Sequence, residues 1–213
     1  MAWTETERAA LVATFRHADP EAPTLCEGWN VRRLLAHLVQ REHSPWRRAG
    51  DELRKSAPGA EKNLGPLADS ARTPEGYQAL LQRFAAGTSS WSPMTWLGDA
   101  VQLLEYVVHH EDVRRATDPP AAPRVLPPGE EQALWQRLGG LAKLAYRSSP
   151  VGVELALPDG RRRTVRKGPD AVLLTGAAIE LALHAFGRHG AAHVRVDGSP
   201  DAVRKFADWA QAS

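Results

Sequence analysis

Apolar side chains recur every three to four residues in four separate stretches between residues 4 and 116. This spacing places them on one face of an α-helix, and such a face must be buried against a partner. We therefore expect helices that begin near Thr4, Val31, Thr73 and Ser92, the last running to about Ala116 before Pro119 and Pro120. Four amphipathic helices of this length predict a helical bundle.

Local start signals support three of these helices. Thr4 and Glu7 have the spacing of a capping box, Asn30 is a favoured N-cap residue, and Thr73 is followed by proline. Between the second and third helices, residues 56–73 are rich in Pro, Gly, Ala and charge, so they predict a loop.

The pattern changes after a proline-rich link and a fifth predicted helix over about 130–146. Alternating apolar residues from Val151 to Leu157, the turn signal Pro158-Asp159-Gly160 and the segment 161–166 predict a β-hairpin. Then come a helix over about 171–186, a strand at 193–196 and a helix from Ser199 to near Trp209. The predicted fold is mainly α, with a helical bundle at 1–148 and a small α+β domain at 149–213.

Charge and cysteine content exclude several classes of protein. The formal net charge of +2 is too small to indicate a polyanionic partner, and no stretch reaches the roughly 18 apolar residues that span a bilayer. We expect a cytoplasmic protein that binds neither nucleic acid nor membrane. The single cysteine, Cys26, excludes an internal disulfide and a multi-cysteine metal site, so a bound metal would use histidine and carboxylate ligands.

Glu105 and His109 are four residues apart on a predicted helix, so their side chains share one face. Asp112 adds a third polar group to that face. His37 lies in the apolar stripe of the second helix, and antiparallel packing of the two helices would bring its imidazole opposite the pair. Two histidines and a glutamate leave one position of a tetrahedral ion open, as in catalytic zinc sites.

Simpler interpretations exist for each of these residues. A Glu–His pair at this spacing also forms surface hydrogen bonds, and a histidine in an apolar stripe can be a core residue. His110 and His43 are rival ligands, but His110 is rotated about 100° from His109 and His43 lies beyond the apolar stripe. Cys26 is interpreted as a small buried hydrophobe. The run Arg161 to Arg163 is interpreted as a solvated hairpin edge.

Two motifs resemble a known family. The stretch Leu25–Leu38 reads LCEGWNVRRLLAHL and the stretch Glu105–Val113 reads EYVVHHEDV. Both are similar to motifs of the mycothiol-dependent maleylpyruvate isomerase family, a group of DinB-like metal-binding four-helix bundles. Further likeness at Gly168–Ala171, Thr175–Ala178 and Phe186–Arg188 extends the resemblance to the family's small C-terminal α/β domain.

The resemblance implies a divalent metal held by His37, Glu105 and His109. It also implies mycothiol as cosubstrate, so the expected partners are a low-molecular-weight thiol and an electrophilic small molecule. Zn²⁺ is the expected cofactor and Ni²⁺ an alternative, because Mg²⁺ prefers oxygen ligands.

Asp112 and Arg188 are the candidate catalytic residues, Asp112 to orient a ligand and Arg188 to reach an acidic substrate. Each also has a simpler interpretation as a charged residue on a helix surface or at a helix end. The implied activity is that of an S-transferase or isomerase. The alternative function is a non-catalytic metal- or small-ligand-binding protein that acts as a sensor or interaction module.

Overall fold

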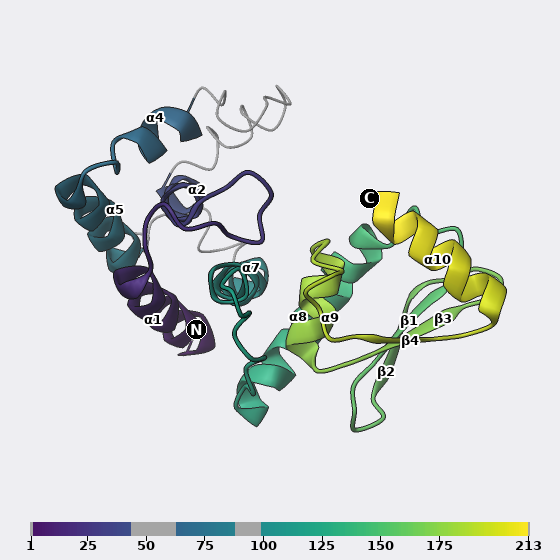
Figure 1. The fold of residues 1–213 in the computed structure, drawn as a ribbon. Helices are drawn as coiled ribbons and strands as arrows, with labels where there is room; N and C mark the ends of the chain where they lie inside the picture. The colour runs from purple at the N-terminus through teal and green to yellow at the C-terminus, as the bar shows by residue number, and fades with distance from the viewer. Residues whose placement is uncertain (1, 44–62, 88–98, 213) are drawn as a thin grey trace. The chain divides into compact units, whose positions relative to one another are not determined.

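The structure, a computed structural model, describes residues 2–43, 63–87 and 99–212. Two compact units divide the chain, Met1–Pro123 and Arg124–Ser213 (Figure 1). The first is helical, and the second contains a small mixed sheet with helices. The predicted fold class, mainly α with a small α+β domain, is therefore confirmed.

The described helices of the first unit pack around one core. They are α1 (Ala2–His17), α2 (Val31–His43), α4 (Leu64–Asp69), α5 (Pro74–Ala86) and α7 (Asp99–Arg114). α1 lies against α5 and α7, and α2 lies against α4 and α5. Among the largest fully buried side chains of this core are Phe15, Leu34, Leu35, Leu38, Leu81, Phe84 and Tyr106.

Two of the three predicted helix starts are confirmed. The Asn30 side chain accepts a hydrogen bond from the Arg33 N–H at 2.9 Å, and the Thr73 hydroxyl accepts one from the Gly76 N–H at 3.1 Å. The capping box at Thr4 is wrong, because α1 already begins at Ala2. Glu7 instead pairs with a histidine of α7.

The loop predicted at 56–73 is wrong in part, because it contains the short helix α4. Leu64 and Ala68 of this helix are buried beside α2, and tertiary packing therefore outweighs the loop-forming composition. Residues 56–62 and the helix start predicted at Ser92-Pro93 lie outside the described residues.

The second unit begins with a long helix and continues with a four-stranded sheet of order β2-β1-β3-β4. β1 is antiparallel to β2 and parallel to β3, and β4 is antiparallel to β3. Its elements are α8 (Pro128–Ala145), β1 (Val153–Ala156), β2 (Arg162–Arg166), β3 (Val172–Thr175), α9 (Ala178–Ala185), β4 (Arg195–Asp197) and α10 (Pro200–Ala212).

The helix predicted over 171–186 is wrong in its first part, which forms β3. Val172 and Leu174 are fully buried, and the strand pairs with β1 along its whole length. Such a short apolar run has no periodicity that separates a buried strand from a helix, so the partner strand decides. α9 then starts two residues after Gly176.

The fifth helix lies with the sheet. α8 packs on α9 and β2, and the Arg163 guanidinium lies 4.7 Å from the centre of the Trp135 ring. The structure thus places the division between its units at Pro123, before α8, whereas the boundary expected at 148/149 follows this helix. β2 is an edge strand, as expected for the arginine run.

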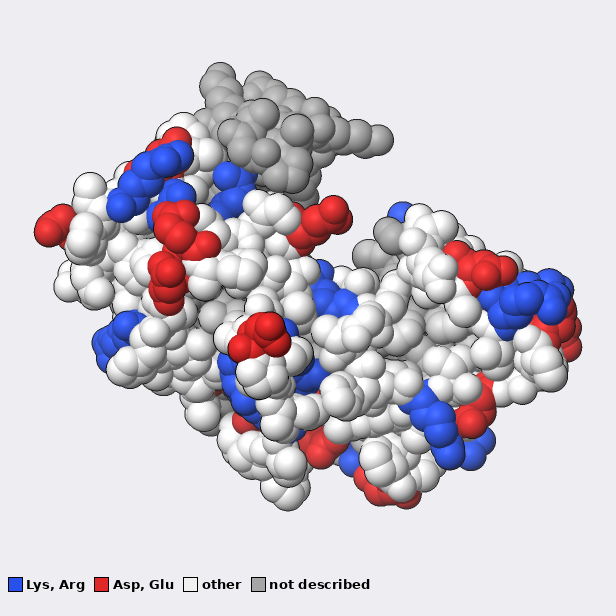
Figure 2. Space-filling model, in the orientation of Figure 1, with Lys and Arg blue, Asp and Glu red and all other residues white. Residues whose placement is uncertain are grey.

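Charged side chains of both signs are interspersed on the visible face of each unit (Figure 2). This distribution agrees with the small net charge of +2. Among the described helices, none is both long and apolar enough to cross a bilayer.

Candidate metal centre

α2 and α7 bring the three predicted ligands together. His37 comes from α2, and Glu105 and His109 come from α7, where they are one helical turn apart. One ligand atom from each of the three side chains lies within 4.8 Å of the others. Glu105 and His109 are buried and His37 is half-buried.

Distances around the His109 ring distinguish its two nitrogens. Nε2 lies 3.4 Å from Oε2 of Glu105, whereas Nδ1 lies 2.8 Å from Oδ2 of Asp112. Two ligand atoms that each lie about 2.1 Å from a tetrahedral ion are about 3.4 Å apart. The Nε2 side therefore has the spacing of a ligand pair, and the Nδ1 side has that of a hydrogen bond.

A second group of potential ligands shares the same histidine. Cys26, His109 and Asp112 also have ligand atoms within 4.8 Å of one another. The Cys26 thiol is 3.2 Å from Oδ2 of Asp112 and donates to it. Because one ring nitrogen binds one ion, a single metal can use Nε2 with His37 and Glu105, or Nδ1 with Cys26 and Asp112.

Glu105 is held as a carboxylate. Burial raises its pKa, but the hydrogen bond with His109 and the positive charges of His109, Arg41 and His37 outweigh burial and hold the pKa at about 2. Nη1 of Arg41 lies 2.6 Å from Oε1 of Glu105. One carboxylate oxygen is thus bound by arginine, and the other faces His109.

His109 is held as an imidazolium in this arrangement. Burial lowers its pKa, but hydrogen bonds with Asp112, Cys26 and Glu105 together raise the pKa well above the usual histidine value. A metal ion at Nε2 would therefore compete with a proton there.

Aromatic packing fixes the His37 ring. The Trp29 ring lies with its centroid 5.0 Å from that of His37, and the His37 and His109 rings are nearly perpendicular, 5.4 Å apart. The loop before α2 is tied to α7, because the Leu25 N–H donates to the Asp112 carbonyl at 3.0 Å.

Residues 4–114, more than half of the chain, match the family described as the mycothiol maleylpyruvate isomerase N-terminal domain. The chain belongs to this family. The match runs from the first turn of α1 to the end of α7 and so includes every residue of both candidate ligand groups.

Two solved structures share the fold of most of the chain. A crystal structure of the mycothiol-dependent maleylpyruvate isomerase has a TM-score of 0.61 at 17% sequence identity, and the likeness covers 92% of this chain and 90% of that one. A histidine-to-alanine mutant of that isomerase gives a TM-score of 0.60, with the same identity and coverage. Among curated proteins none matches.

The rival histidines of this family member are engaged elsewhere. Both ring nitrogens of His110 have partners, Glu7 at 2.8 Å and the Thr14 hydroxyl at 2.7 Å, on the α1 side of α7. Burial and the charge of Arg83 lower the pKa of His43 at the end of α2. Neither histidine belongs to either ligand group.

Cys26 and Arg41 are the neighbours that sequence reasoning missed. Cys26 is half-buried and packs against the hydrophobic core, and its thiol also donates a hydrogen bond to Asp112. Arg41 follows His37 by four residues, a spacing that places both on one face of α2. That spacing was the sequence signal that could have placed Arg41 beside the site. No such signal existed for Cys26, because its contact with α7 depends on a loop that folds back.

Arg188 follows α9 in the second unit, and its guanidinium donates to the Phe186 carbonyl at 2.6 Å. Its role toward a substrate stays a prediction. Asp112 lies where the sequence placed it, on the face of His109, and its catalytic role likewise stays a prediction.

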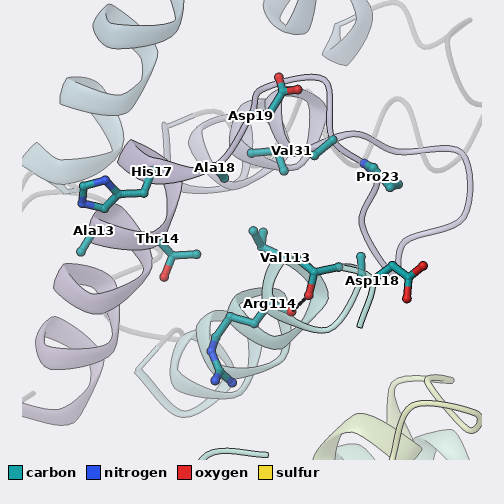
Figure 3. Close-up of a pocket in the computed structure, with 13 residues that line it drawn as sticks. Ala13, Thr14, His17, Ala18, Asp19, Pro23, Val31, Val113, Arg114 and Asp118 are labelled. Atoms are coloured by element: carbon teal, nitrogen blue, oxygen red, sulfur yellow. Dashed lines mark hydrogen bonds between the residues drawn. The ribbon is translucent and has the colours of Figure 1, made fainter. Parts of the chain in front are cut away.

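A large cavity lies farther along α7 (Figure 3). It has a volume of about 890 Å³, and Val113, one turn after His109, contributes to its wall. Small apolar residues of α1 and the following loop form much of the remaining wall, and Arg114 and Asp118 add charge. A cavity of this size and composition can hold a small molecule.

Proposed function

We propose that this protein is a metal-dependent enzyme that uses a low-molecular-weight thiol, mycothiol, in an S-transfer or isomerisation reaction. His37, Glu105 and His109 hold the ion, which is Zn²⁺ or another transition metal such as Ni²⁺. The observation that carries the proposal is the convergence of two imidazoles and one carboxylate, with Nε2 of His109 3.4 Å from Oε2 of Glu105. Membership of the family supports the assignment.

The donor set suits the proposed metals. Two nitrogens and one carboxylate oxygen leave a fourth tetrahedral position for a small ligand, and imidazole favours zinc, nickel or copper over Mg²⁺. In such a site the ion lowers the pKa of a bound thiol, which then is a nucleophile at neutral pH.

The chain's own residues prepare this site. Asp112 accepts a hydrogen bond from Nδ1 of His109 and thereby directs Nε2 toward Glu105 and His37. Arg41 binds one oxygen of Glu105 and keeps the carboxylate ionised. Trp29 packs on His37 and restricts its rotation. In this proposal the electrophile is a small molecule.

Metal analysis of purified protein tests the ligand assignment. We expect about one equivalent of metal in wild type and none in His37→Ala or Glu105→Ala. The control variant His110→Gln, outside both groups, should retain the metal.

Titration with mycothiol then tests thiol use, because the metal-loaded wild type should bind mycothiol and the metal-free variants should not. Retention of metal by all variants, or a metal-loaded protein that binds no thiol, would contradict the proposal.

A non-catalytic binder is the second candidate function. The observation that favours it is the second ligand group, since Cys26, Asp112 and Nδ1 of His109 could hold an ion in place of the His37–Glu105 group. If Asp112 bound such an ion through both carboxylate oxygens, the ion would have four protein donors and no position for a thiol. Loss of metal in Cys26→Ala, together with no mycothiol binding by the wild type, would support this alternative.

A further inference from the structure

The large cavity beside α7 is bounded by α1, by the loop that follows α1, and by the first residue of α2 (Figure 3). Val31 and Val113 line it and are buried, and much of the remaining wall consists of alanine. None of the lining residues belongs to either metal-ligand group. An apolar molecule therefore fits here without using the metal centre.

The Thr14 hydroxyl is a polar group in this apolar wall. It lies 2.7 Å from Nε2 of His110, and Nδ1 of the same ring lies 2.8 Å from Oε1 of Glu7. An ionised carboxylate only accepts hydrogen bonds, so Nδ1 carries the proton, and in the neutral ring Nε2 accepts from the Thr14 hydroxyl. The Thr14 oxygen keeps lone pairs that can accept a hydrogen bond from a ligand. The wall thus favours a ligand that carries a donor.

The one arginine of the lining is compensated. Arg114 donates to the buried Glu111 at 2.8 Å and to the Ala122 carbonyl at 3.2 Å. Figure 3 shows its guanidinium directed away from Val31 on the opposite wall. The charge of Arg114 therefore does not attract an anion into the cavity.

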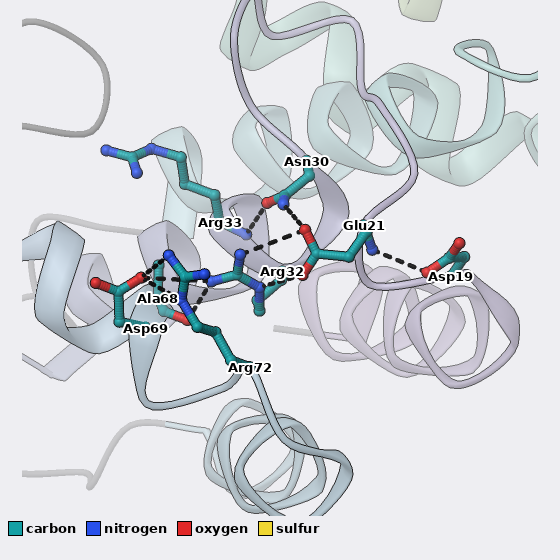
Figure 4. A network of polar contacts seen from close by, with 8 residues as sticks. All are labelled: Asp19, Glu21, Asn30, Arg32, Arg33, Ala68, Asp69 and Arg72. Carbon is teal, nitrogen blue, oxygen red and sulfur yellow. Dashed lines mark hydrogen bonds and ion pairs between the residues drawn. The ribbon is translucent and has the colours of Figure 1, made fainter.

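Two aspartates of the lining have no such compensation. Within the part of the chain that the structure describes, neither Asp19 nor Asp118 forms an ion pair. Asp19 accepts a hydrogen bond from the Glu21 N–H at 2.9 Å, whereas the guanidinium of Arg32 binds the Glu21 carboxylate (Figure 4). Figure 4 also shows Arg72 apart from Asp19. The two carboxylates make the potential in the cavity negative, which favours a cation.

We propose that this cavity binds a small apolar amine. The hydrocarbon part lies against Val31, Val113 and the alanines, and the Thr14 oxygen accepts a hydrogen bond from the ammonium group. The field of Asp19 and Asp118 favours the positive charge of the ligand. This inference goes beyond the proposed function, because it adds a second binding site with a different class of ligand.

Titration calorimetry with octylamine, 1-octanol and octanoate tests the site. These probes share one alkyl chain, and at neutral pH their head groups are cationic, neutral and anionic. Octylamine should bind about three- to tenfold more tightly than 1-octanol, and octanoate should bind most weakly. Octylamine should bind equally well after EDTA has removed any metal, because the site does not include the ion.

Variants of the wall locate the binding site. Ala13→Trp fills the cavity from an exposed position of α1 and should abolish octylamine binding. Ala9→Trp is the matched control, one turn earlier on α1, exposed and outside the lining, so it should bind as wild type does. The double variant Asp19→Asn, Asp118→Asn should lose the preference for the amine over the alcohol. Asp208→Asn, which replaces an exposed aspartate of α10, should keep it.

Replacement of Thr14 tests the hydrogen bond. Thr14→Val has nearly the same shape and should weaken octylamine binding about tenfold, whereas Thr14→Ser keeps the hydroxyl and should bind nearly as wild type does.

The inference would be overturned if wild type bound no octylamine, or bound octylamine no more tightly than octanoate. Octylamine binding that is unchanged in Ala13→Trp, or that disappears with EDTA treatment, would place the amine elsewhere. An amine preference that survives replacement of both aspartates would likewise contradict the proposed origin of the selectivity.

Discussion

His109 has one set of neighbours at each ring nitrogen, and this asymmetry defines the candidate site. Nδ1 lies against the carboxylate of Asp112, which also accepts a hydrogen bond from the Cys26 thiol, and Nε2 faces Glu105. A hydrogen bond to the far nitrogen of a metal-binding histidine fixes its tautomer and its orientation. We therefore interpret Asp112 and Cys26 as supports of a ligand.

Replacement of Asp112 separates a supporting role from a ligand role. Asp112→Ala should lower metal affinity about 10- to 100-fold, because His109 loses the acceptor that orients it. Asp112→Asn retains an acceptor oxygen and should lose less. Competition with a chromogenic chelator measures both affinities.

Cys26→Ala provides the control for this experiment. It should retain metal, because the thiol touches Asp112 and is no ligand in the proposed site. If Cys26→Ala abolishes metal binding, the second group at Nδ1 holds the ion.

His184 makes the stability of the second unit depend on pH. Burial, and then the charge of His189, lower its pKa from the usual 6.5 to about 4, and its Nδ1 lies 2.9 Å from the Tyr146 hydroxyl. Between these pH values His184 binds a proton in the unfolded chain and not in the folded chain. The free energy of unfolding therefore decreases as pH falls from about 6.5 toward 4. The loss should reach about 2 kcal/mol at pH 5.

Urea unfolding at pH 7 and pH 5 measures this effect. His184→Gln should lack this share of the pH dependence, whereas His193→Gln, which replaces an exposed histidine of the same unit, should keep it. An identical pH dependence in wild type and His184→Gln would show that His184 titrates normally.

At the scale of elements, buried polar contacts connect α1, α2 and α7. The Tyr106 hydroxyl of α7 donates to Glu42 of α2 and accepts from Nη2 of Arg8 of α1 at 2.8 Å. All three side chains are buried. This connection holds the backbones of α2 and α7 in the register that brings His37 opposite His109.

Tyr106→Phe should lower the free energy of unfolding by about 1.5–3 kcal/mol, because it removes a partner from two buried charged groups. Tyr77→Phe is the matched control. Its hydroxyl donates to the neutral Phe15 carbonyl at 2.9 Å, so its loss should cost about 1 kcal/mol. Chemical denaturation compares the two variants. Equal losses would contradict the view that the Tyr106 contacts are the stronger.

At the scale of the whole molecule, the first unit is joined to the second by a segment that has no helix or strand. Residues 115–127 contain four prolines, and Val125 is 96% exposed. Exposed segments between compact units are preferred sites of proteolysis.

Limited trypsin digestion should therefore cut after Arg124 and release a stable fragment of residues 125–213, which mass spectrometry identifies. Arg124→Gln should abolish this fragment. Rapid degradation of the fragment in wild type would show that the second unit depends on the first for its stability.

The sequence by itself determined the features that local geometry controls. The starts of α2 and α5 depend on side chains within three residues of the cap, and the hairpin follows from the turn Pro158–Gly160 and the alternation before it. The shared face of Glu105 and His109 follows from the pitch of one helix. Each of these depends on interactions within a few residues, so the sequence pattern predicts them.

Only the tertiary structure decided the rest. Cys26 contacts Asp112 because a loop folds back on α7. Glu7 pairs with His110 of α7 and does not cap α1. Residues 172–175 form a strand because β1 lies beside them. His37 meets His109 through the packing of two helices. These contacts join distant segments, and their free energy depends on packing and burial, which local periodicity does not encode.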